Sequence, residues 1–146
     1  MLFLIIFFFA VFANLFVDYE VDAIGHSADR LAPPSIEHIF GTDGYGRDTF
    51  ARVLYGTRNS LEMALTATVC ALGISIIIGA VAAFYGGILD SIIMRVLDMF
   101  MGIPVILLAI AVSASLGPGK ENLILAIIIA QIPQFTRVTR SAILNV

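Results

Sequence analysis

The sequence predicts an all-α integral membrane protein with four transmembrane helices. Of its 146 residues, 60% are hydrophobic and 13% are charged, and the mean hydropathy is +1.00. Soluble domains carry roughly 45–50% apolar and about 25% charged residues. This composition therefore excludes a disordered chain, an ordinary cytosolic enzyme and a nucleic-acid-binding tail. The net charge is −3 and there is no run of basic residues, so we expect no nucleic-acid partner. The expected partner is the lipid bilayer.

Residues 1–17 are the first predicted transmembrane helix, an almost unbroken apolar run that starts directly at Met1. A full span needs about 20 such residues, so the run is slightly short. It lacks the basic start and the cleavage site of a signal peptide. We expect a membrane helix in a natural protein that begins further upstream.

Residues 18–59 are predicted to form a loop outside the bilayer that ends in a short interfacial helix. The Pro33-Pro34 pair and the surrounding polar residues are typical of extended, solvated backbone. Near the end of the segment, apolar residues recur at helical spacing, with charged residues on the other faces. These apolar residues are Phe50, Val53, Leu54 and Leu61.

Residues 60–146 are predicted to hold three further helices, as part of a larger transmembrane domain. The first of them, from Ser60 to Tyr85, carries a small residue at every fourth position, which lets a neighbouring helix approach closely in lipid. The stripe consists of Ala67, Ala71, Ser75, Gly79 and Ala83. We expect a helix–helix seam here. The alternative is that small residues are simply common in membrane helices.

The third span, residues 90–116, is predicted to contain a kink and a charge pair. Gly86-Gly87 ends the preceding helix, and Pro104 removes a backbone hydrogen bond within the span. Arg95 and Asp98 are three residues apart, so they share a face and can form an intramembrane ion pair. Such a pair is either a pathway element facing a cavity or a structural pair near the membrane surface.

The fourth span, residues 122–135, is predicted to be interrupted by Pro133. Arg137 and Arg140 then mark an exit into water. Residues 136–146 resemble the start of a further helix with no terminator, and we expect the natural protein to continue.

A loop motif rich in turn-forming residues precedes the second span; it comprises Gly41, Thr42, Asp43, Gly46, Arg47 and Asp48. Asp43 can bond its own backbone, and the glycines supply positive φ. The motif lacks the Gly-Lys-Ser/Thr ending of a phosphate loop. No residue set offers a nucleophile with its base or metal-ligand spacing, so we predict no catalytic, cofactor or metal site. A membrane-embedded enzyme would require His38, Asp43 and Asp48 to converge on a pocket.

Several short motifs, in order, resemble those of permease subunits of bacterial dipeptide/oligopeptide/nickel ABC importers of the DppC/OppC type. The run HIFGTDGYGRDTFAR from His38 and the run YGTRNSL from Tyr55 are similar to the signature ahead of that family's second span. Ala51 stands where the family usually has serine. The later pieces are Phe84-Tyr85-Gly86-Gly87, Met94-Arg95-x-x-Asp98, Ile103-Pro104, Leu116-Gly117-Pro118-Gly119 and Arg137-x-x-Arg140.

The resemblance implies a permease subunit that forms half of a peptide translocation pathway by alternating access. It implies a multi-pass location in the inner (cytoplasmic) membrane and four kinds of partner: a second permease subunit, two ATPase subunits, an extracytoplasmic solute-binding protein and the lipid bilayer. ATP would bind the partner ATPases, so this chain would hold no cofactor and have no enzyme activity of its own. Open alternatives are an importer of nickel or another small solute, or a non-transport membrane scaffold.

Two further expectations follow from the resemblance. Family members continue into a cytoplasmic helix that docks on the ATPase and into two more spans, so we expect this chain to be truncated after Val146. The family also places residues 18–59 outside the cell, although the count of arginines and lysines on the two sides favours the opposite orientation.

Overall fold

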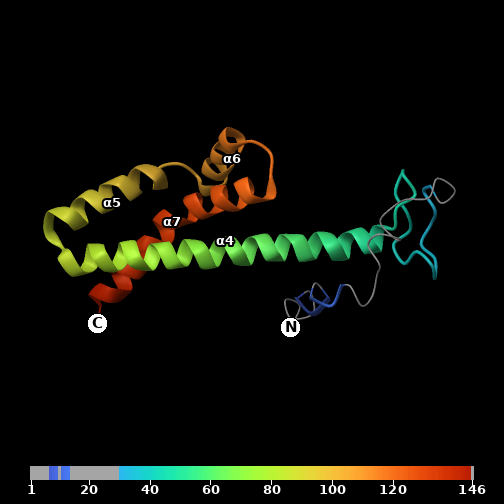
Figure 1. Ribbon diagram of the computed structural model, residues 1–146, viewed down its shortest axis with the longest axis horizontal. Coiled ribbons are helices and arrows are strands. Elements are labelled where there is room, and N and C mark those ends of the chain that lie inside the picture. The colour runs from blue at the N-terminus through green and yellow to red at the C-terminus, as the bar shows by residue number, and fades with distance from the viewer. Residues whose placement is uncertain (1–6, 10, 14–29, 146) are drawn as a thin grey trace. The chain divides into compact units, whose positions relative to one another are not determined.

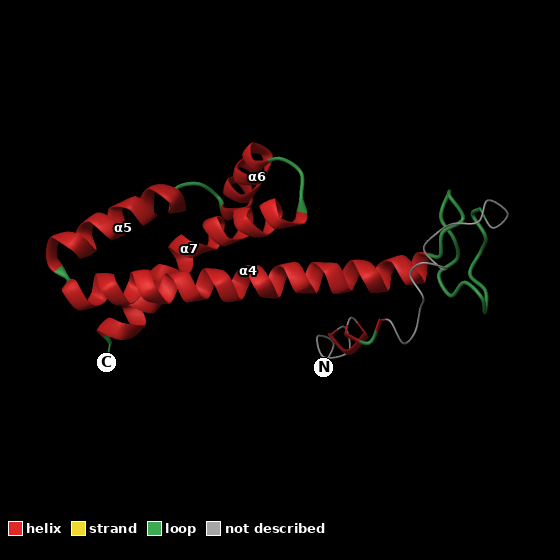
Figure 2. Cartoon of the chain, in the orientation of Figure 1, coloured by secondary structure: helices red, strands yellow, loops and turns green. Residues whose placement is uncertain are grey.

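The computed structural model describes residues 7–9, 11–13 and 30–145, and the regular secondary structure within them is helical (Figures 1 and 2). The main helices are α4 (Thr49–Tyr85), α5 (Gly87–Met101), α6 (Val105–Leu116) and α7 (Lys120–Leu144). The chain divides into two compact units, Met1–Glu62 and Met63–Val146, and each is described by itself. The predicted all-α membrane fold is confirmed.

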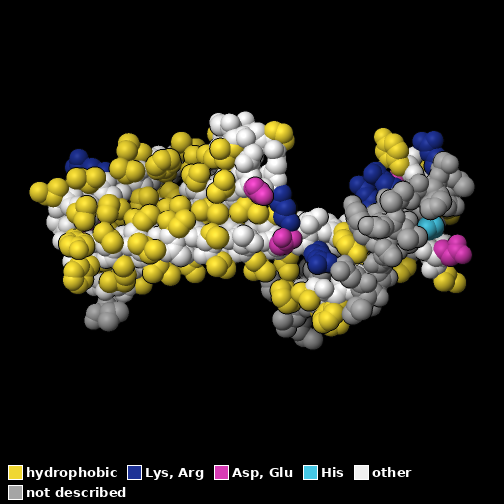
Figure 3. Space-filling model, viewed as in Figure 1, with side chains coloured by type: hydrophobic (Ala, Val, Ile, Leu, Met, Phe, Trp, Pro, Cys, Tyr) yellow, Lys and Arg dark blue, Asp and Glu magenta, His cyan; other side chains and the backbone are white. Residues whose placement is uncertain are grey.

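Two helices are long and apolar enough to cross a bilayer: α4, with 37 residues, and α7, with 25. The α5–α6 pair could form a third span, broken by a bend of 87°. The surface of these helices is mostly hydrophobic in the face drawn in Figure 3, and many large apolar side chains on them are exposed. Such a surface is expected where lipid or another subunit takes the place of water.

Most of the predicted first span lies outside the described residues. Within residues 1–17, only 7–9 and 11–13 are described, and residues 7–9 are helical. Loop residues 18–29 also lie outside the described part of the chain.

The structure joins two elements that the sequence pattern separated, because α4 runs without a break through the predicted boundary at Ser60. The predicted boundary between a separate interfacial helix and the second span is therefore wrong, because both belong to α4. The change from polar to apolar side chains at Ser60 changes how the helix is solvated, but it removes no backbone hydrogen bond. The helix ends where two glycines adopt positive φ, 58° at Gly86 and 56° at Gly87, as the Gly-Gly pair predicted.

The kink expected at Pro104 is a complete break between α5 and α6. The Gly102 N–H bonds the Asp98 carbonyl at 3.1 Å and closes α5. Pro104 has no N–H to continue that ladder. Its carbonyl instead accepts the first bond of α6, from the Leu108 N–H at 3.0 Å.

The interruption expected at Pro133 is wrong: α7 continues through this proline to Leu144, so residues 136–144 belong to the same helix. Membrane helices tolerate proline because neighbouring groups satisfy the backbone around it. Next to this proline, the Ser75 hydroxyl of α4 donates a hydrogen bond to the Ile132 carbonyl at 3.2 Å and links the two helices.

Helix α7 is the central element of the unit Met63–Val146. It packs against α6 and α5. It also contributes Ile128 to a buried cluster that contains Ala67 and Ala71 of α4. Every other described helix of this unit therefore contacts α7.

Candidate functional site

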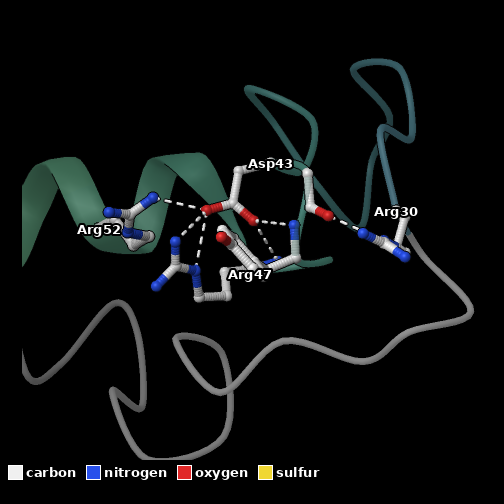
Figure 4. A network of polar contacts seen from close by, with 6 residues as sticks. Arg30, Asp43, Arg47 and Arg52 are labelled. Carbon is white, nitrogen blue, oxygen red and sulfur yellow. Dashed lines mark hydrogen bonds and ion pairs between the residues drawn. The ribbon is translucent and has the colours of Figure 1, made fainter.

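Asp43 is the centre of a polar network in the loop that precedes α4 (Figure 4). Its Oδ2 accepts hydrogen bonds from Arg47 Nε at 2.8 Å and from Arg52 Nη1 at 2.6 Å. Its Oδ1 accepts the backbone N–H groups of Tyr45 at 2.8 Å and of Arg47 at 3.1 Å. Aspartate commonly closes a turn in this way. The carboxylate ties the loop to the first turn of α4.

The Arg47 side chain, which donates a hydrogen bond to the carboxylate, lowers the pKa of Asp43 from 3.8 to about 2. Desolvation raises the pKa, but the backbone N–H groups of Arg47 and Tyr45 lower it, and together with the Arg47 side chain they outweigh desolvation. Asp43 is therefore ionised throughout the physiological range. The Arg47 guanidinium also lies over the Tyr45 ring, 4.8 Å from its centroid.

Asp48 performs two structural tasks with its two oxygens. Its Oδ1 accepts the Ala51 N–H at 2.9 Å and so caps the start of α4. Its Oδ2 lies 2.8 Å from His38 Nδ1. The side chain is largely buried, at 11% exposure. Asp48 thus fixes both the helix start and the preceding turn.

The remaining motif residues shape the backbone. Gly41 has φ of +68°, and a Cβ added there would lie 2.5 Å from the Ala32 carbonyl oxygen. Thr42 Oγ1 accepts the Ala32 N–H at 2.8 Å, and Thr42 forms an isolated β-bridge with Asp48. Gly46, also at positive φ (74°), donates its N–H to the Asp43 carbonyl at 2.9 Å.

This loop is built to hold a shape. Asp43 accepts hydrogen bonds from two arginines and from backbone N–H groups, whereas Asp48 contacts His38 and caps the start of α4. In the described part of the chain, no three His, Cys, Asp or Glu side chains are grouped so that they could hold a metal ion. The arrangement supports a structural role for the motif, in which it braces the loop against the start of α4, better than an acid–base site.

The small-residue stripe of α4 lies against α7. Ala67, Ala71 and Ser75 are fully buried, and the Ser75 hydroxyl makes the bond to the Ile132 carbonyl described above. A Cβ added at Gly79 would lie 3.0 Å from Thr139 Cβ and 3.1 Å from the Thr136 carbonyl oxygen. Ala83, the last member, is half-buried. A larger side chain has no room over most of this stripe.

Two ion pairs join α5 to α7. Arg140 donates from Nε to one oxygen of Asp90 and from Nη2 to the other, both at 2.5 Å. Arg137 pairs with Asp98. The later acid of α5, Asp98, pairs with the earlier arginine of α7, Arg137, and the earlier acid pairs with the later arginine. The two helices are therefore antiparallel where these pairs form. The first pair is better shielded, with side-chain exposures of 17% and 29% against 53% and 51%.

The ion pair predicted between Arg95 and Asp98 is wrong. Asp98 pairs with Arg137 across the interface, and Arg95 is exposed at an open surface pocket beside Ile88 and Ile92. Sharing a helix face contributes only a few tenths of a kcal/mol to a pair at this spacing. A neighbouring helix that offers a guanidinium can therefore take the carboxylate.

Sequence reasoning missed Asp90 and Arg140 as a pair. In the sequence, Arg137 and Arg140 follow an apolar run, and this position predicts an exit into water and not an ion pair. The sequence did contain one signal for these pairs: two acids lie eight residues apart in the third predicted span, and two arginines lie three residues apart after the fourth. That signal could not name partners until the helices were placed.

Known proteins resemble this chain over most of its length. Residues 75–146 match the family described as binding-protein-dependent transport system inner membrane component. A dipeptide transport system permease protein of Alkalihalophilus pseudofirmus is 41% identical over 136 residues, which cover 93% of this chain and 44% of that protein.

Two other relatives show the same pattern. A probable D,D-dipeptide transport system permease protein of Escherichia coli is 40% identical over 93% of this chain and 45% of its own length. A glutathione transport system permease protein of Pectobacterium atrosepticum is 43% identical over 77% of this chain and 38% of its own length. The chain spans less than half the length of these relatives.

Proposed function

From the premise that this chain belongs to the family of binding-protein-dependent transport system inner membrane components, as a DppC/OppC-like permease, we propose that it forms part of the translocation pathway of a peptide importer. The observation that carries the proposal is the 41% identity to a dipeptide permease over 93% of the chain. Three relatives from different bacteria are named for dipeptides, D,D-dipeptides and glutathione. Short peptides are the chemistry that these names share.

The proposed machine contains this permease, a second permease subunit, two ATPase subunits and an extracytoplasmic binding protein in the inner membrane. The family's description, which names transport that depends on a binding protein, supports the last of these partners. ATP would be bound and hydrolysed by the ATPase subunits. The permease would supply helices that rearrange, and not a reacting side chain.

The proposed mechanism is alternating access, in which groups of helices rock about a shared pathway. Three features support it. The α5–α6 pair is broken by 87°, α7 carries an internal proline, and the loop before α4 is held by its own hydrogen bonds. Transport of this kind needs both stiff elements and defined points of bending.

Genetic complementation tests the proposal. The complete gene that encodes this chain, with its neighbouring genes, is placed in a bacterial host that lacks its own peptide permeases and requires an amino acid. Growth on a dipeptide containing that amino acid is the expected result. If the cells grew with the free amino acid but not with the dipeptide, the proposal would be contradicted. Restored accumulation of radioactive nickel would assign the nickel alternative instead.

A further inference from the structure

Two helix breaks from distant parts of the sequence lie together in the unit Met63–Val146. Pro104 marks the break between α5 and α6, and Pro133 lies within α7. Both line one cavity of about 160 Å³, together with Leu108 of α6 and Ala130 of α7. Pro104 has no N–H with which to continue the hydrogen bonding of α5, and Pro133 removes one backbone hydrogen bond within α7. The backbone is thus weakened at adjacent points of two packed helices.

The two ion pairs lie on one side of this cavity. Arg137 and Arg140 follow Pro133 by about one and two helical turns. Their partners, Asp98 and Asp90, precede the α5–α6 break on the same side. The cavity therefore separates a clamped region, α5 with residues 134–144, from α6 with residues 120–132.

The two ion pairs, Asp90–Arg140 and Asp98–Arg137, form a clamp between α5 and α7 that has the geometry of a rigid connection. Arg140 engages both oxygens of Asp90, and such a bidentate contact fixes orientation as well as distance. The Asp98–Arg137 pair, eight residues along α5 from the first, resists rotation about it. Leu97, the residue before Asp98 on α5, is buried.

We propose that α5 and residues 134–144 of α7 move as one lever, which turns at the paired breaks Pro104 and Pro133. The proposal rests on the proposed function, since it assigns the moving part of an importer. Hinges are a few residues at the ends of elements that absorb changes in φ and ψ, and the cavity gives the side chains at this hinge room to repack. The four charged residues are positioning residues, because they act by holding the lever together.

Distance measurements in the complete importer test the lever. In full-length permease with Cys70 replaced by serine, spin labels are placed on exposed residues: Val96 with Val138 inside the lever, and Ile92 with Ile106 across the hinge. We expect the Val96–Val138 distance to stay constant between the nucleotide-free and ATP-trapped complexes. The Ile92–Ile106 distance should change. A change within the lever, or no change across the hinge in a complex that transports peptide, would overturn the proposal.

Variants then test the clamp itself. Asp90→Asn should broaden the Val96–Val138 distance distribution and lower peptide uptake several-fold. Exchange of the charges, Asp90→Arg with Arg140→Asp, should restore a narrow distribution and recover part of the uptake. Arg95→Gln is the matched control, because Arg95 is exposed on α5 and has no ion pair in the described part of the chain.

If the Val96–Val138 distance distribution were unchanged in Asp90→Asn, the proposal that the ion pairs hold the lever together would be overturned. Uptake by the unaltered complex is measured on the same preparation. If that complex took up no peptide while the distances behaved as expected, the importer assignment would fail and the lever would stand.

Discussion

Arg140 of α7 grips both carboxylate oxygens of Asp90 of α5 at 2.5 Å, although the two residues lie fifty positions apart in the sequence. Charged groups within an apolar helical unit are costly unless they are paired. Here each acid of α5 that faces α7 meets an arginine. The pairing explains how two helices with mostly apolar surfaces carry four charges at their interface.

Asp90→Asn should destabilise the full-length permease more than Asp98→Asn. The Asp90–Arg140 pair is the better shielded, so its loss leaves a guanidinium with less access to water, whereas the Asp98–Arg137 pair is half-exposed. The measurement is the thermal stability of detergent-extracted complex. Equal losses from the two variants would mean that shielding does not distinguish the pairs.

Gly79→Leu should loosen the contact between α4 and α7. The added side chain would meet Thr139 and the Thr136 carbonyl within 3.1 Å, and overpacking of this kind costs about 1–3 kcal/mol. Gly73→Leu is the matched control on the same helix, because nothing lies within 4 Å of a Cβ there. Recovery of assembled complex from membranes is the readout, and equal recovery of the two variants would contradict the seam.

Gly41→Ala should reduce the amount of folded permease and leave the affinity for the binding protein unchanged. Positive φ costs an L-residue about 1–2 kcal/mol, and the new Cβ would also press on the Ala32 carbonyl. Gly44→Ala, with open space around its Cβ and no positive φ, is the control. If assembly were normal and binding-protein affinity fell tenfold, the loop would be a docking surface and not a brace.

Asp43 should make the loop sensitive to acid only at very low pH. The pKa of Asp43 is lowered from 3.8 to about 2. Folding therefore gains from its ionised form above about pH 3.8, and that gain disappears as the pH falls toward 2. Cleavage of the loop by pepsin should rise steeply between pH 4 and 2 in the unaltered protein. Asp43→Asn should be cleaved readily across the whole range, and a rise that began near pH 5 would contradict the lowered pKa.

The sequence predicted which residues are apolar, small or turn-forming, and much of the fold follows from those properties. The Gly86-Gly87 pair marked the end of a helix because only glycine adopts positive φ at both positions without cost. The small residues from Ala67 to Gly79 marked the face of α4 that lies on α7, because in lipid close approach requires small side chains.

Other features depend on tertiary contacts that a single sequence does not contain. Pro104 and Pro133 look alike as helix breakers, but one separates two helices and the other is absorbed within α7. The partner of Asp98 was predicted on its own helix, since only local spacing was available, whereas Arg137 reaches it from α7. The extent of α4 was misjudged because polarity reports on solvation and not on backbone hydrogen bonding.

Uptake by purified importer in proteoliposomes tests the peptide-permease assignment most directly. The permease is reconstituted with the proposed partners: a second permease subunit, two ATPase subunits and a binding protein. Labelled dipeptide and ATP are then supplied on opposite sides of the membrane. We expect dipeptide to accumulate only when both ATP and the binding protein are present, and to fall several-fold in Asp90→Asn but not in Arg95→Gln. Vesicles that hydrolyse ATP and accumulate nickel or no solute at all, with dipeptide excluded, would contradict the assignment.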